Sequence, residues 1–128
     1  MKRRIYVSDV YHQKEIIQAL TELLGDGGEV TDSLEGKFDF FFLYARDVLH
    51  HHHDVLNLKA RFGNPGAQTI ATSSLESFLT DVQEKPELGI DYVIDKTAII
   101  ENLILATSPR PGSDKKKLFE VLGLPTPS

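Results

Sequence analysis

Short apolar runs alternate with segments of helical periodicity in the first part of the chain. Ile5–Val7 is an apolar, β-favouring run that stops at Ser8, as expected of a buried strand. The following segment carries one apolar stripe at helical spacing and ends at a glycine-rich turn, residues 25–28. That stripe comprises Ile16, Ile17, Ala19, Leu20, Leu23 and Leu24. Residues 29–33 form a second short run, so the pattern predicts strand, helix and strand in succession.

Residues 37–45 are the most strand-like segment of the chain. Residues 40–43 are Phe, Phe, Phe and Leu, and an unbroken apolar run is typical of a parallel strand that is covered on both faces. Only the seven residues 31–37 separate it from the second strand, which leaves no helix in between. An extended segment of that length still recrosses one sheet width, at about 3.3 Å per residue. The pattern predicts a central parallel strand reached by a crossover that has lost its helix.

The second half of the chain continues the alternation of helices and strands. Apolar positions from Val48 to Phe62 predict one helix, which the turn residues 63–66 end. Residues 67–73 predict a fourth strand, and Ser73 or Ser74 can cap the helix that follows it.

Residues 90–94 predict a fifth strand, and Thr97 a cap for a last helix that runs through Ile104. Five strands separated mostly by helices indicate an α/β sheet wound on both faces, because right-handed crossovers place helices on either side. This is the doubly wound, flavodoxin-like architecture. We expect five parallel strands in the order 2-1-3-4-5.

Length and composition fit one ordered domain. The chain has 128 residues, of which 41% are apolar and 26% charged, and these values are those of globular proteins rather than of disordered or fibrous ones. We expect the α/β domain to occupy residues 1–107. Residues 108–128 begin as a Pro/Gly linker and contain a short amphipathic stretch, so we interpret them as a tail with one docking patch.

Charge and cysteine content exclude several classes of function. A net charge of -5 disfavours contact with a phosphate backbone, so we do not expect a nucleic-acid partner. The chain has no cysteine, which excludes disulfides and thiolate chemistry. No apolar run has the roughly 18–20 residues of a membrane span. We therefore expect a cytoplasmic protein with no membrane partner and no cofactor.

Functional side chains of a doubly wound sheet gather outside the carboxyl ends of its strands, near the point where the strand order reverses. The strand ends of this chain carry hydroxyl, carboxylate, phenol and amine groups. The residues expected at this edge are Ser8, Asp9, Tyr44, Thr72, Asp95 and Lys96. They contain no matched nucleophile, acid and base, so we expect no catalytic residue and no enzymatic activity.

The order and spacing of these segments resemble a response-regulator receiver domain, the phosphoacceptor module of two-component signalling. The segments that carry the resemblance are RIYVSDVYHQKEIIQAL, FDFFFLYARD, TIATSS and GIDYVIDKTAIIENLI, and they span about residues 3–106. In receivers an acidic pair after the first strand holds magnesium, and an aspartate that ends the third strand accepts the phosphoryl group. A lysine that ends the fifth strand pairs with that group.

Several receiver positions carry other residues in this chain. The acidic pair falls on Ser8 and Asp9, which leaves one carboxylate, and the phosphoacceptor position falls on Tyr44, which cannot form an acyl phosphate. The lysine position falls on Asp95, and Lys96, one place later, is still close enough in register to reach the pocket. The resemblance therefore implies a degenerate receiver, or pseudo-receiver, without aspartate phosphorylation and without a metal site.

Two further positions bear on partners. Thr72 matches the switch hydroxyl of receivers, and Tyr92 falls near the aromatic position of their partner surface. The resemblance implies a signalling module that works by protein–protein interaction, with another protein or with a second copy of the chain.

The short crossover also resembles that of the BRCT domain, a phosphopeptide and DNA-end scaffold of repair and replication proteins. The segment ALTELLGDGGEVTDSLEGKFDFFFLYA carries this resemblance, with Ser8 at the phosphate-contacting position. The strand and helix expected over residues 90–106 exceed that fold, and Asp9 replaces a glycine whose amide would contact phosphate. A BRCT-like phosphopeptide or DNA-end scaffold is the alternative hypothesis.

Four consecutive histidines, His50–His53, form the remaining candidate for a site. Residues i and i+3 of a helix share a face, so His50 and His53 could bind a metal beside Asp47 or Asp54. Four adjacent imidazoles span nearly a full turn and cannot all face one ion. We therefore expect a solvated, polar helix start at this position.

Overall fold

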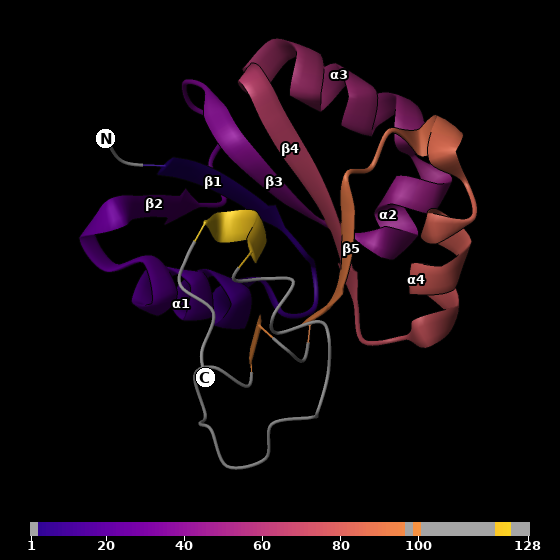
Figure 1. Ribbon diagram of the computed structural model, residues 1–128, viewed down its shortest axis with the longest axis horizontal. Helices are drawn as coiled ribbons and strands as arrows, with labels where there is room; N and C mark the ends of the chain where they lie inside the picture. Colours follow the sequence, from indigo (N-terminus) through magenta and orange to yellow (C-terminus); the bar gives the residue numbers. More distant parts are fainter. Residues whose placement is uncertain (1–2, 97–98, 101–119, 124–128) are drawn as a thin grey trace.

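Five parallel strands form the centre of the protein. The computed structural model describes residues 3–96, 99–100 and 120–123 (Figure 1). The strands are β1 (Arg3–Ser8), β2 (Gly28–Thr31), β3 (Phe38–Tyr44), β4 (Gly63–Ser73) and β5 (Tyr92–Asp95). They pair in the order β2-β1-β3-β4-β5, and every pair is parallel. The prediction of a five-stranded, doubly wound parallel sheet in the order 2-1-3-4-5 is confirmed, and the fold is flavodoxin-like.

Helices cover both faces of this sheet. The helices of the described residues with assigned bounds are α1 (Gln13–Leu24), α2 (Ala45–His50), α3 (His52–Phe62) and α4 (Glu76–Gln83), with short 3-10 turns η1 (Gly25–Gly27) and η2 (Pro86–Leu88). One core cluster contains the buried face of α1, and the other contains buried residues of α2, α3 and α4 (Figure 1). We call these sides the α1 face and the α2–α4 face. None of the helices in the described part of the chain has the length and apolar character that a membrane span requires.

The apolar run of β3 supplies both cores. Phe40 and Phe42 belong to the core of the α1 face, whereas Phe41 and Leu43 belong to the core of the α2–α4 face. Successive side chains of a strand point to opposite faces, so an unbroken apolar run is needed when both faces are covered. This confirms that residues 40–43 mark the central strand.

The start of β4 differs from the prediction. Residues 63–66 were expected to be a turn that ends a helix, but they belong to β4. The register passes from Phe38 opposite Gly63 to Phe40 opposite Gln68, so β4 bulges beside β3. The carboxylate of Asp39 accepts a hydrogen bond from Asn64 Nδ2 at 3.0 Å, and this contact ties the bulge to β3.

The single helix predicted from Val48 to Phe62 is also wrong. The chain turns into α2 directly after β3, and the backbone leaves helical geometry at His51, where φ is -134° and ψ is 43°. The N–H of His51 donates to the carbonyl of Asp47 at 2.7 Å, which closes α2 before α3 begins. The histidine run therefore spans a break between two helices. The geometry assumed for a metal held by His50 and His53 on one helix does not exist.

The predicted serine cap of α4 is wrong as well. The residue at the N-cap position is Leu75, and no side chain caps the helix. Ser73 Oγ instead accepts a hydrogen bond from the N–H of Leu75 at 3.0 Å, before the helix begins. This local turn satisfies one backbone donor and leads the chain from β4 into α4.

The crossover from β2 to β3 contains no helix, as predicted, and Arg4 holds it in place. Arg4 Nη1 donates to the carbonyls of Glu35 at 2.6 Å and Lys37 at 3.0 Å. The guanidinium also lies over the ring of Phe38, 4.6 Å from its centroid. One side chain of β1 thus fixes the crossover against the sheet. No pattern in the sequence pointed to Arg4.

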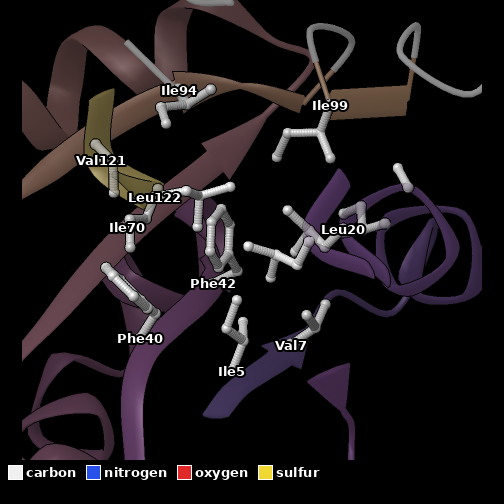
Figure 2. Packing of buried hydrophobic residues seen from close by; sticks show 13 residues of the cluster. Ile5, Val7, Leu20, Phe40, Phe42, Ile70, Ile94, Ile99, Val121 and Leu122 are labelled. Atoms are coloured by element: carbon white, nitrogen blue, oxygen red, sulfur yellow. The ribbon is translucent and has the colours of Figure 1, made fainter. Parts of the chain in front are cut away.

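Two separate pieces of the C-terminal part are described. Ile99 and Ile100 are helical, but the predicted cap Thr97 and the rest of that helix from residue 101 lie outside the described residues. Of the predicted tail only residues 120–123 are described, and Val121 and Leu122 are buried in the core of the α1 face (Figure 2).

Candidate functional site

The carboxyl ends of the strands meet at one edge of the sheet, as parallel pairing requires. Asp9 follows β1, Tyr44 ends β3, Thr72 stands next to the last residue of β4, and Lys96 follows β5. The strand order reverses between β1 and β3, which is the position where doubly wound folds place their function. We call Asp9, Tyr44, Thr72 and Lys96 the rim cluster.

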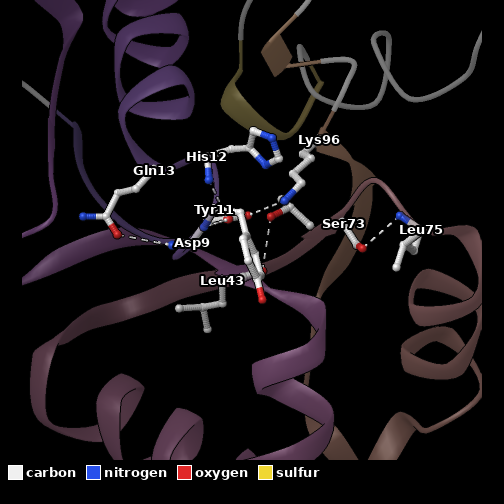
Figure 3. A network of polar contacts seen from close by, with 9 residues as sticks. Asp9, Tyr11, His12, Gln13, Leu43, Ser73, Leu75 and Lys96 are labelled. Carbon is white, nitrogen blue, oxygen red and sulfur yellow. Dashed lines mark hydrogen bonds and ion pairs between the residues drawn. The ribbon is translucent and has the colours of Figure 1, made fainter.

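A buried ion pair forms the centre of the rim cluster. Lys96 Nζ lies 3.0 Å from Asp9 Oδ2, and the two side chains are only 2% and 1% exposed (Figure 3). The other carboxylate oxygen, Asp9 Oδ1, accepts hydrogen bonds from the backbone N–H groups of Tyr11 and His12, both at 3.0 Å. Burying two charges is costly unless they pair and their remaining groups are hydrogen-bonded. Both oxygens of Asp9 are therefore engaged within the protein.

Aromatic rings cover the ammonium group of Lys96. Its Nζ lies 4.7 Å from the ring centroid of Tyr44 and 6.0 Å from that of Tyr11, within the range of cation–π attraction. The rings of Tyr11 and Tyr44 contact each other edge to face, with centroids 5.7 Å apart. Tyr11 is 60% exposed, so it forms the outer wall of the site, while Tyr44 is buried.

Burial changes the acidity of the Tyr44 phenol. Its pKa is raised above the ordinary value of 10.0, first because burial disfavours the phenolate and then because the negative charge of Asp9 repels it. The charge of Arg46 acts in the opposite direction. Tyr44 is thus an uncharged, buried ring at the edge of the sheet at physiological pH.

The hydroxyl groups at the end of β4 are bonded to nearby backbone. Thr72 Oγ1 donates to the carbonyl of Leu43 on β3 at 3.3 Å. Ser73 is fully buried, and its hydroxyl oxygen accepts the N–H of Leu75. These hydrogen bonds link β4 to β3 and to the start of α4.

The remaining predicted site residues lie at or near the same strands. Ser8 is the last residue of β1, opposite Leu43 on β3, and Asp95 is the last residue of β5, opposite Ser73 on β4. Both therefore stand at the edge where the rim cluster lies. Tyr92 is different, because it begins β5 and packs half-buried against the core of the α1 face.

The lysine reaches the site from the position after the strand. The receiver resemblance placed the family's lysine at Asp95 and Lys96 one residue late, yet Lys96 is the residue that meets Asp9. The structure also adds Tyr11 and His12, which no sequence pattern marked as site residues. The available signal was that Val10 and Tyr11 are large apolar residues outside the helical stripe.

The arrangement offers little to a metal ion. Magnesium binds proteins through one or two carboxylates and keeps several waters, but both oxygens of the single carboxylate in the rim cluster are engaged, one of them by an ammonium group. Across the described residues, no three histidine, aspartate or glutamate side chains gather as ligands. The rim cluster is built to hold a charge pair inside the protein.

Comparison with known proteins finds no matching family model, no matching curated protein and no matching solved structure. The assignment of a flavodoxin-like fold therefore rests on the sheet topology and on the residues that produce it. The receiver and BRCT resemblances remain hypotheses about function.

Proposed function

We propose that this protein is a non-enzymatic signalling module of the degenerate receiver type, which binds a protein partner and does not accept a phosphoryl group. It combines the strand order 2-1-3-4-5, which receivers share, with a rim in which an internal charge pair stands where receivers hold metal and phosphate. A cytoplasmic location and a place in a two-component type of signalling belong to the same proposal.

The observation that carries the proposal is the buried pair of Asp9 and Lys96. In receivers the first strand leads to carboxylates that hold magnesium, and the fifth strand leads to a lysine that pairs with the phosphoryl group. Here the lysine and the remaining carboxylate bind each other at 3.0 Å. An ammonium group therefore occupies the side of Asp9 that a cation would need.

Tyr44 supports the proposal at the phosphoacceptor position. A phenol cannot form the acyl phosphate of a receiver, and the buried ring covers Lys96 Nζ at 4.7 Å. An incoming phosphoryl donor would have to displace this ring and separate the ion pair. Both steps oppose phosphorylation.

The fifth strand weighs against the BRCT alternative. β5 pairs with β4 over residues 92–95, and a fifth strand exceeds the BRCT fold. The feature that favoured the BRCT alternative was the short crossover between β2 and β3. In this five-stranded sheet, hydrogen bonds from Arg4 to the carbonyls of residues 35 and 37 hold that crossover in place.

The proposal is tested by incubating the full chain with acetyl phosphate and magnesium and measuring its intact mass. We expect no phosphoryl adduct in the mass spectrum and no change in the amide NMR spectrum of the protein. A stable adduct on any aspartate would contradict the proposal. A phosphoserine peptide titrated into the same sample tests the alternative, because saturable binding that is lost in Ser8→Ala would favour the BRCT-like function instead.

A further inference from the structure

A short C-terminal turn covers part of the α1 face of the sheet. We call residues Glu120–Gly123 the docked turn. Val121 is 8% exposed and Leu122 is fully buried, whereas Glu120 faces solvent. Figure 2 shows Leu122 beside Ile70 and Phe42 of the sheet. The sequence analysis predicted an amphipathic patch here, and two of its apolar side chains are inserted into the core of this chain.

The docked turn ends as a helix ends. The N–H of Gly123 donates to the carbonyl of Glu120 at 3.1 Å, and Gly123 has a φ of +70°, the left-handed conformation common after a helix. A Cβ at Gly123 would lie 2.7 Å from Nη2 of Arg3, so the guanidinium of β1 stands against this end. A cation beside the carbonyl end of a helical turn is electrostatically favourable.

The surface under the docked turn adjoins the rim cluster. Ile70 stands two residues before Thr72 on β4, so the two share a face by the two-residue period of a strand. Ile94 lies near the end of β5, and Lys96 follows that strand directly. Tyr92, the residue that the receiver resemblance placed at the partner surface, packs against this same core. The covered surface is therefore continuous with the proposed signalling site.

We propose that the sheet surface beneath the docked turn is the partner-binding surface, and that the docked turn occupies it in place of the partner. The partner it fits is an amphipathic helical segment of another protein, with two adjacent aliphatic side chains and a glycine after its last turn. Those features are the ones that the surface accepts from this chain. The inference rests on the proposed function, since it names the partner class and the regulation of an interaction module.

The chain length between the docked turn and the domain permits this exchange. Residues 101–119 separate Ile100 from Glu120, and nineteen residues can span up to about 60 Å. That number of residues is sufficient for the turn to leave the surface and remain covalently attached. A tethered segment acts at an effective concentration on the order of millimolar, so a partner must bind well enough to displace it.

The test uses a fluorescent peptide with the sequence of residues 114–128 as the probe. The wild-type full chain should bind it weakly, because its own docked turn holds the surface. A full chain with Val121→Asp and Leu122→Asp should bind the probe at least about tenfold more tightly. A control peptide carrying the same two aspartates should bind neither chain.

Two results with the uncleaved chains would overturn the inference. One is that the variant with both aspartates, shown to be folded by circular dichroism, fails to bind the probe. The other is that this variant and the wild-type chain bind the probe equally. If the variant does not fold, a protease site inserted within residues 108–113 of the full chain provides the second measurement. After cleavage the body should release the C-terminal peptide, stay folded and rebind the probe saturably, whereas unfolding on release would make the turn an ordinary part of the core. The acetyl phosphate experiment does not depend on these outcomes, so the two proposals fail separately.

Discussion

Removing the ammonium group of the rim cluster should cost the protein a large part of its stability. In Lys96→Met the carboxylate of Asp9 stays buried, held by the backbone N–H groups of Tyr11 and His12, but loses its counter-ion. Breaking a buried pair by removing one partner costs about 3–5 kcal/mol. Domains of this size are stable by only about 5–15 kcal/mol in total.

A double-mutant cycle separates the pair from its surroundings. Asp9→Asn should cost a similar amount, because it leaves the ammonium group of Lys96 buried without a counter-ion. The double variant carries no buried charge and should lose only about 1–3 kcal/mol, the cost of an imperfectly satisfied amide. The two single losses therefore exceed the double loss by more than about 3 kcal/mol.

Urea unfolding followed by far-UV circular dichroism measures these differences. With a slope of about 1–3 kcal/mol per molar urea, Lys96→Met should lower the midpoint by more than about 1 M. The matched control is Lys59→Met, because Lys59 Nζ lies 3.7 Å from Asp91 Oδ2 in a pair whose side chains are 37% and 38% exposed. An exposed pair contributes at most about 1 kcal/mol. If the two lysine variants lost the same stability, the description of a buried, closed pair at the rim would be refuted.

Two further predictions concern Tyr44 and the crossover. The pKa of Tyr44 in the folded protein lies above the ordinary value of 10.0, so the unfolded chain loses this proton at a lower pH than the folded protein does. The free energy of unfolding should therefore fall as the pH rises from about 10 through the raised pKa. Urea titrations at alkaline pH should show a smaller fall in Tyr44→Phe. Gly36→Ala should destabilise the protein more than Gly66→Ala. Both glycines have a similar positive φ, +80° and +83°, so the backbone strain is matched. Of the two, only Gly36 has the guanidinium of Arg4 at the place where a Cβ would lie. Thermal unfolding of the two variants measures the difference, and equal losses would show that Arg4 does not fill this space.

The sheet could be predicted because its signals are local. The four consecutive apolar residues 40–43 indicated a strand covered on both faces, and the alternation of runs and stripes indicated the winding order. The helix break at His51 could not be predicted in the same way. Its apolar positions fit one continuous stripe, and the break lies in the backbone conformation of His51, with φ of -134° and ψ of 43°, which periodicity does not reveal.

The site was predicted only where strand ends revealed it. The residues named from their positions at or after strand ends were Asp9, Tyr44, Thr72 and Lys96. The pairing of Lys96 with Asp9 was not predicted, because it depends on where the fifth strand ends to within one residue. Arg4 escaped notice because its partners are backbone carbonyls, and any sequence offers those. Contacts between distant segments were the part that local patterns could not supply.

Lys96 occupies the side of Asp9 where a cation would bind. The decisive experiment is a titration of the full chain with magnesium, followed by the amide NMR signals of Asp9, Tyr11 and His12, with Lys96→Met as the comparison. We expect millimolar magnesium to leave these three signals of the wild-type protein in place. A saturable shift of the same signals in the wild-type protein would show that the cation reaches Asp9 despite Lys96.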